Sequence, residues 1–208
     1  ASATVIREFD DWFQKKLPGL LETPEFPIDQ LRIQWDNLVI EQNKKLARYA
    51  SETGTRMGTT VVAFLIVDDK YYIMNIGDSR AYMITDAIYQ LTKDQTYIQY
   101  EMDLGHLTWE QAQTHPQRNV LLQCVGASDE IRPDYFVGDA VPDTTFFLCS
   151  DGFRHVISPD EIYEKLRPED MTDEEVMLQN AISLVELNKA RKEVDNISVA
   201  VIRTCREG

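Results

Sequence analysis

Three aspartates stand where apolar, strand-forming runs of the chain begin or end, and their carboxylates could bind metal ions. They are Asp78 in the segment 77–80, Asp151 in the segment 150–153 and Asp195 in the segment 195–198. Hard divalent cations such as Mg²⁺ and Mn²⁺ prefer oxygen ligands, and carboxylates from separate elements can meet when a chain folds. The sequence therefore predicts one metal site assembled from three distant segments.

Each of these segments also fits a purely structural role. Asp-Gly and Asp-Asn are common turn sequences, and an aspartate carboxylate can accept hydrogen bonds from its own turn. Gly152, which follows Asp151, lets the backbone turn sharply beside whatever that carboxylate holds. The occurrence of all three segments in one chain favours the metal site, while the turn interpretation stays open for each segment alone.

The spacing of apolar residues in the first 51 positions predicts two helices. Apolar residues recur at helical spacing from Ser2 to Leu17, and Pro18-Gly19 is expected to end that helix. A second helix follows Pro27, with Asp29 as its expected N-cap. The side chains expected to face the core are Val5, Ile6, Phe9, Trp12, Phe13, Leu17, Leu31, Trp35, Leu38, Val39, Leu46 and Tyr49.

The rest of the chain alternates between strand and helix signals. Short β-rich runs predict strands at 61–67, 71–76, 81–84, 132–137, 145–149 and 197–202. Gly77 is expected at a bend between two of them. Helices are predicted at 94–104, at 108–114, from Ser158 onward, and at 176–188 after a capping box that starts at Thr172. This order predicts an α+β domain built on antiparallel sheet.

Composition narrows the class of protein. The 208 residues carry 35 acidic and 21 basic side chains, a formal net charge of −14, which argues against nucleic-acid binding because phosphate backbones need clustered Lys and Arg. No apolar run is long enough to span a membrane. Cys124, Cys149 and Cys205 lack the spacing of a zinc site or a disulfide framework, so reduced thiols are expected. We therefore expect a soluble, cytoplasmic enzyme.

Six short motifs occur in an order that resembles bacterial metal-dependent protein phosphatases of type 2C, the PPM family. They are Gly58-Thr59-Thr60, Gly77-Asp78-Ser79-Arg80, Leu91-Thr92-Lys93-Asp94, His115-Pro116-Gln117-Arg118-Asn119, Ser150-Asp151-Gly152-Phe153 and Asp195-Asn196-Ile197-Ser198. The resemblance covers nearly the whole chain. It implies a single catalytic domain over 1–208, folded as an α-β-β-α sandwich of two antiparallel sheets flanked by helices.

The resemblance also implies an activity and roles for particular residues. The activity is hydrolysis of phosphoserine and phosphothreonine in proteins, the substrates of a Ser/Thr kinase, by water that two or three Mn²⁺ or Mg²⁺ ions activate. Asp151 and Asp195 would hold the first ion, and Asp78 with Asp151 a third, weaker one. A flap at about 92–119, which includes Arg118, would help select substrates. His115 and His155 are candidate proton donors to the leaving group, or ordinary surface residues.

One family motif is absent from this sequence. Family members carry an Asp-Gly-x-Gly-Gly segment whose aspartate bridges the two main ions, and an arginine that binds the phosphate, both upstream of the first helix. Since the sequence opens at Ala1-Ser2-Ala3-Thr4, we expect that the first strands of the fold are not represented in it. Two alternatives follow: a catalytically inactive, phosphatase-like binding or regulatory module, and pairing of exposed sheet edges with a second copy.

Overall fold

The computed structural model describes residues 1–205, which divide into two compact units. Unit 1 consists of Ala1–Val61 and Gln95–Asp134, and unit 2 of Val62–Asp94 with the chain from Tyr135 onward. The prediction of a single domain over 1–208 stays a prediction.

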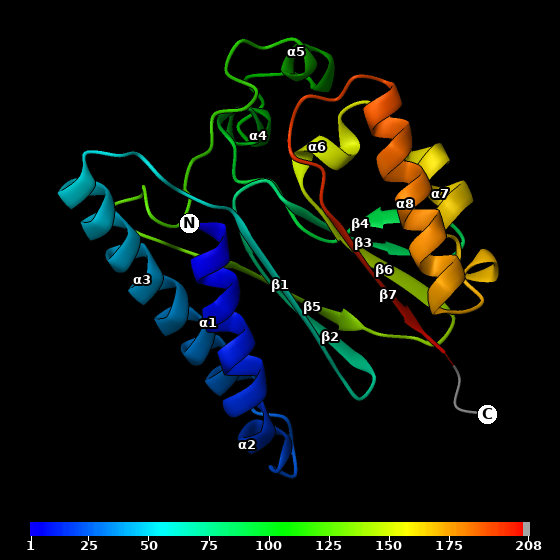
Figure 1. Cartoon of the computed structure of the whole chain (residues 1–208), viewed down its shortest axis with the longest axis horizontal. Helices are drawn as coiled ribbons and strands as arrows, with labels where there is room; N and C mark the ends of the chain where they lie inside the picture. Colours follow the sequence, from blue (N-terminus) through cyan, green and yellow to red (C-terminus); the bar gives the residue numbers. More distant parts are fainter. Residues whose placement is uncertain (206–208) are drawn as a thin grey trace. The chain divides into compact units, whose positions relative to one another are not determined.

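Unit 1 is helical. Its helices are α1 (Ser2–Lys15), α2 (Leu17–Leu21), α3 (Ile28–Thr53), α4 (Tyr97–Asp103) and α5 (Trp109–Gln113) (Figure 1). Helices α1 and α3 pack through aromatic rings: Trp12 lies edge-on to Trp35 at 5.5 Å between centroids, and Phe9 lies 6.1 Å from the same ring. Trp12 Nε1 also donates a hydrogen bond to Gln34 Oε1 at 2.7 Å. The two helices predicted in the first 51 residues are therefore confirmed as α1 and α3, and the short α2 between them was not predicted.

Several details of the helix predictions are wrong. Pro18 and Gly19 lie inside α2 rather than ending α1, because proline is tolerated in the first turn of a helix. Helix α3 begins one residue before Asp29, which therefore lies in the first turn instead of at the N-cap. Ile6 and Tyr49, expected in the core, are 67% and 53% exposed.

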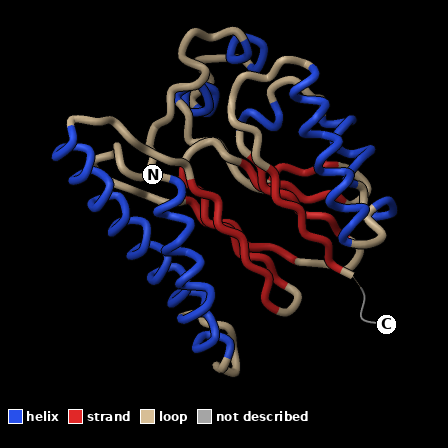
Figure 2. The backbone as a smooth tube through the Cα atoms, in the orientation of Figure 1, coloured by secondary structure: helices blue, strands red, loops and turns tan. Residues whose placement is uncertain are grey.

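Unit 2 contains two sheets and the remaining helices (Figures 1 and 2). The strands are β1 (Val61–Val67), β2 (Lys70–Ile76), β3 (Arg80–Ile84), β4 (Ile88–Gln90), β5 (Asp134–Asp139), β6 (Thr144–Cys149) and β7 (Val199–Thr204). One sheet has the order β1-β2-β5 and the other β4-β3-β6-β7. The helical elements are α6 (Asp151–Arg154), α7 (Pro159–Leu166), a 3₁₀ turn (Pro168–Asp170) and α8 (Glu174–Ala190). The six predicted strands are confirmed, with shifted ends, whereas β4 and α6 were not predicted.

Strand β6 explains how the two layers of unit 2 are held together. Phe146 lies in the apolar cluster between the sheets, 5.1 Å from Phe64 and 5.6 Å from Tyr71 between ring centroids. Its neighbour Phe147 points to the opposite face, into the cluster that α6, α7 and α8 cover. Because successive strand residues face opposite sides, a continuous apolar run marks a strand buried on both faces. Each fully buried Phe contributes about 1.5–3 kcal/mol of transfer free energy.

The N-cap residues of α7 and α8 show where each of these two helices begins. At α7 the predicted N-cap Ser158 is confirmed, and it forms a capping box with Glu161. At α8 the capping box predicted at Thr172 is wrong, because Asp173 is the N-cap and its carboxylate accepts the Val176 N–H at 2.9 Å. A carboxylate at this position also interacts favourably with the positive end of the helix dipole.

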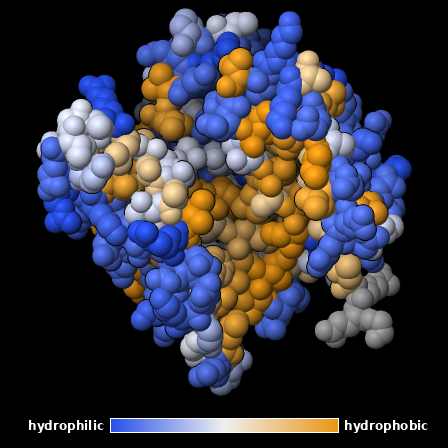
Figure 3. Space-filling model, viewed as in Figure 1, coloured by the Kyte–Doolittle hydropathy of each residue, from blue (hydrophilic) through white to orange (hydrophobic). Residues whose placement is uncertain are grey.

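An apolar surface lies beside β7, which is the edge strand of its sheet. Figure 3 shows apolar residues gathered over the strands in this view. A groove runs between α8 and β7, and its apolar lining includes Met171, Met177, Leu178, Val199 and Val201.

None of the helices among residues 1–205 combines the length and the apolar character needed to cross a membrane.

Candidate metal centre

The pairing of β3 with β6 brings two of the predicted aspartates together. The strands are antiparallel, and Arg80 lies opposite Cys149 at the end of the ladder. Asp78 lies two residues before Arg80 and Asp151 two residues after Cys149, so both lie just beyond this last pair of the ladder. Gly77, at φ 100, supplies the bend before Asp78 that a residue with a Cβ rarely adopts. The chain topology therefore delivers both carboxylates to one end of this sheet.

Asp151 opens the short helix α6 directly after β6. Ser150 is the N-cap, and Asp151 Oδ1 accepts the N–H of Gly152 at 2.9 Å. The Ser150 hydroxyl donates to the Asn196 carbonyl at 2.9 Å and accepts the Ser198 N–H at 3.0 Å. These hydrogen bonds attach the segment that follows Asp195 to the strand end that carries Asp151.

Asp195 lies close to α6, although its carboxylate is engaged locally. A Cβ built on Gly152 would lie 3.1 Å from the Asp195 Cβ. Asp195 Oδ1 accepts the N–H of Asn196 at 2.7 Å, and Glu193 Oε1 accepts the N–H groups of Val194 and Asp195 at 2.9 Å each. The turn interpretation of Asp195 thus describes its hydrogen bonds in this structure. Its role as a metal ligand stays a prediction.

His155 lies between two acidic side chains. Its Nε2 is 3.7 Å from Asp151 Oδ2, and its Nδ1 is 3.4 Å from Glu193 Oε2. Glu193 in turn holds the backbone before Asp195, as described above. His155 therefore connects α6 to the segment that carries Asp195, which is a positioning contact, and its predicted role as a proton donor stays a prediction.

The Asp78 carboxylate is in an environment that disfavours its charge. Burial raises the pKa of Asp78, the nearby Asp151 carboxylate raises it further, and the guanidinium of Arg154 opposes both effects. Two carboxylates held close together repel each other, and a bound cation relieves that repulsion. The pair therefore has the electrostatic character of a cation site.

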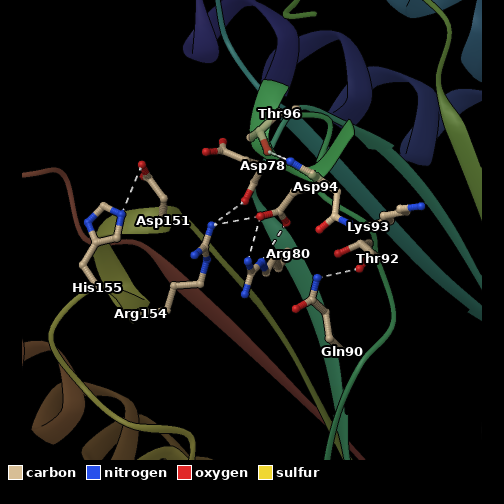
Figure 4. A network of polar contacts seen from close by, with 12 residues as sticks. Asp78, Arg80, Gln90, Thr92, Lys93, Asp94, Thr96, Asp151, Arg154 and His155 are labelled. Atoms are coloured by element: carbon tan, nitrogen blue, oxygen red, sulfur yellow. Dashed lines mark hydrogen bonds and ion pairs between the residues drawn. The ribbon is translucent and has the colours of Figure 1, made fainter. Parts of the chain in front are cut away.

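Three charged groups surround this pair and were not recognised as one network from the sequence (Figure 4). Arg80 donates from Nε and Nη2 to the two oxygens of Asp94, at 2.7 Å each, in a bidentate ion pair. Arg154 Nη2 lies 3.6 Å from Asp94 Oδ2 and donates to the backbone carbonyl of Asp78 at 3.1 Å. No local pattern could have indicated that Arg154 meets Asp94, because the two residues are 60 positions apart in the chain.

Burial and the neighbouring charges shift the pKa values of Arg80 and Cys149. Burial alone would lower the pKa of Arg80, but the hydrogen bonds that Arg80 donates to Asp94 and the charge of that carboxylate raise it. Burial raises the pKa of the Cys149 thiol at the end of β6 to about 12. That thiol therefore stays protonated at neutral pH and is a poor nucleophile.

The other two predicted site residues belong to unit 1. His115 is half-buried, its Nδ1 accepts the Gln117 N–H at 3.2 Å, and its ring lies 5.9 Å from that of Tyr97. Arg118 is exposed, and its N–H bonds to the His115 carbonyl at 3.1 Å. These contacts stabilise the turn at 115–118. The assignment of a flap at about 92–119 and of Arg118 to substrate selection stays a prediction.

The donor atoms fit a hard divalent cation. Asp78 and Asp151 offer carboxylate oxygens, the ligands that Mn²⁺ and Mg²⁺ prefer, and the Asp151 carboxylate is near enough to raise the pKa of Asp78. Within residues 1–205, however, no group of three or more His, Cys, Asp or Glu side chains is arranged to hold an ion. The fit therefore rests on the two carboxylates, with Asp195 close to the same helix.

Comparison with known proteins identifies the family of this chain. The protein phosphatase 2C family model matches residues 3–195. The serine/threonine protein phosphatase PstP of Mycobacterium tuberculosis is 34% identical over 147 residues, which are 70% of this chain and 27% of that protein. The match thus spans about a quarter of the length of that relative. The chain belongs to the protein phosphatase 2C family.

Solved structures show the same fold. The serine/threonine phosphatase of S. agalactiae superposes with a TM-score of 0.82 at 26% identity, covering 98% of this chain and 79% of that one. The catalytic domain of PstP, solved in complex with two manganese ions, gives a TM-score of 0.76 at 26% identity, with 99% and 80% covered. The predicted fold class, two antiparallel sheets flanked by helices, is therefore confirmed.

Proposed function

We propose that this chain is a metal-dependent protein phosphatase that hydrolyses phosphoserine and phosphothreonine with Mn²⁺ or Mg²⁺. The observation that carries the proposal is the meeting of Asp78 and Asp151 at the end of the β3–β6 ladder. Membership of the phosphatase 2C family and the two manganese ions bound by a structurally similar catalytic domain support it.

The residues of this chain have distinct tasks under this proposal. Asp78 and Asp151 would hold a cation, and Asp195, next to Gly152, would hold a second one with Asp151. Divalent ions in such sites activate water and neutralise the charge of a phosphoryl group. The hydrogen bonds of Ser150 to Asn196 and Ser198 fix the distance between the strand end of Asp151 and the segment of Asp195. Fixed ligand positions favour a site that is ready to bind before the substrate arrives.

The partners follow from the activity. Phosphorylated proteins, the products of a Ser/Thr kinase, are the proposed substrates, and the cytoplasm is the proposed location. The apolar groove beside the edge strand β7 supports the proposal that a second copy pairs along this edge.

The proposal is tested by replacing Asp151 with asparagine, which keeps the size of the side chain but removes its charge. Release of phosphate from a phosphothreonine peptide should require Mn²⁺, stop on addition of a chelator, and fall at least a hundredfold in Asp151→Asn, since a ligand to both ions is lost. Asp160→Asn in the first turn of α7 is the matched control and should keep full activity. Equal rates for the chain and for Asp151→Asn would contradict the proposal.

A further inference from the structure

Arg154 places a positive charge beside the two carboxylates of the candidate metal centre. It lies on α6, three residues after Asp151, and its side chain is only 17% exposed. Its Nη2 donates to the backbone carbonyl of Asp78 at 3.1 Å, so this hydrogen bond does not involve the Asp78 carboxylate. Figure 4 shows the Arg154 guanidinium between Asp151 and Asp94.

The charge of Arg154 is only partly balanced by its acidic neighbour. Asp94 forms a bidentate pair with Arg80, with both distances at 2.7 Å, and its contact to Arg154 is longer, at 3.6 Å. Two guanidinium groups thus share one carboxylate. The excess positive charge lies next to Asp78 and Asp151, as the hydrogen bond of Arg154 to the Asp78 carbonyl and Figure 4 show.

We infer that Arg154 is a built-in positive charge that partly compensates the Asp78–Asp151 pair and thereby weakens the binding of a divalent cation to it. A fixed cation and a mobile cation compete for the same two negative charges, and in a partly buried site their repulsion is little screened by salt. The inference rests on the proposed function, because it takes Asp78 and Asp151 as metal ligands. It adds that the metal affinity of this pair is set by a residue that touches neither the ion nor the substrate.

The charge can be removed while a hydrogen-bond donor is kept. Arg154→Gln is neutral and offers an amide to the Asp78 carbonyl, whereas Arg154→Lys keeps the charge with a different shape. Titration of the metal-free chain with Mn²⁺, followed by calorimetry, measures affinity without any turnover. We expect about tenfold tighter binding in Arg154→Gln, the order of magnitude for one unit charge near a partly exposed site, and near-unchanged binding in Arg154→Lys.

Asp94→Asn provides the opposite change. It removes the acidic group that balances Arg80 and Arg154, so it should weaken Mn²⁺ binding. A purely structural role of the network predicts another pattern, because then Arg154→Gln and Asp94→Asn would both weaken binding by loosening the site. Circular dichroism melting of each metal-free variant checks that it is folded, and Arg154→Met serves as a second neutral variant where Arg154→Gln does not fold.

The outcomes separate this inference from the proposed function. If Asp78→Asn and Asp151→Asn abolish Mn²⁺ binding but Arg154→Gln binds no more tightly than the unsubstituted chain, the built-in charge is refuted and the metal site stands. If Asp78→Asn and Asp151→Asn leave Mn²⁺ binding unchanged, the metal site itself is refuted. If neither the unsubstituted chain nor Arg154→Gln binds Mn²⁺, both the built-in charge and the metal site are refuted.

Discussion

Replacing Gly152 with alanine would insert a methyl group between helix α6 and the segment that carries Asp195. A Cβ at this position would lie 2.7 Å from the Asn196 backbone oxygen and 3.1 Å from the Asp195 Cβ. The nearest of these atoms belongs to the backbone, which cannot rotate away as the end of a long side chain can. The segment after Asp195 would therefore have to move away from α6.

The size of the effect follows from two opposing contributions. Overpacking of this kind costs about 1–3 kcal/mol, whereas replacing glycine with alanine in a helix gains up to about 1 kcal/mol. We therefore expect the free energy of unfolding to fall by about 1–2 kcal/mol. In a domain of this size, that corresponds to a melting temperature lower by about 2–8 °C.

Thermal unfolding of the metal-free protein measures this change, with Gly19→Ala as the matched control. A Cβ at Gly19, in helix α2, would meet no atom within 4 Å, so the control should be neutral or slightly stabilising. Because Gly152→Ala also displaces a predicted ligand, its Mn²⁺ affinity should fall at least tenfold while that of Gly19→Ala stays unchanged. Equal stability and equal Mn²⁺ affinity of the two variants would refute this account of α6.

Two further predictions concern contacts that hold the helices of unit 2. The fully buried Asn188 donates to the Phe153 carbonyl of α6 at 3.0 Å, so Asn188→Ala should lower the free energy of unfolding by about 1–3 kcal/mol in urea titrations, while the exposed Asn37→Ala should not. Hydrogen bonds from Arg191 lower the pKa of Glu161 to about 2, so the carboxylate stabilises the fold above its usual titration range and loses that effect as the pH falls towards 2. The melting temperature of Glu161→Gln should therefore lie below that of the unsubstituted chain at pH 7 and approach it at pH 2; parallel curves would contradict this.

The sequence predicted those parts of the fold that local patterns determine. The apolar runs of β1, β2 and β6 are bounded by turn residues, and the two-residue turn at Asp68 and Asp69 needs no distant contact to form. Short elements were harder to predict. Strand β4 has three residues and α6 has four, which is too few for either periodicity to be visible.

The sequence predicted that these aspartates would lie close together, but it did not predict the charged residues around them; the role of the aspartates as metal ligands stays a prediction. Asp78 and Asp151 could be recognised because each follows an apolar strand, and the pairing of β3 with β6, which ends at Arg80 and Cys149, brings both to the same end of the sheet. Arg154 gave no such signal. Its contacts to Asp94 and to the Asp78 carbonyl depend on how α6 is placed after β6, which only the folded chain determines.

The central claim is that Asp78 and Asp151 together hold a divalent cation. Anomalous diffraction from crystals of this chain soaked in Mn²⁺ tests it most directly, because the scattering of manganese locates the ion without reference to activity. The account predicts an anomalous peak within coordination distance, about 2.0–2.3 Å, of carboxylate oxygens of both residues, and its loss in Asp151→Asn. A peak that avoids both carboxylates, or one that persists unchanged in Asp151→Asn, would contradict the account.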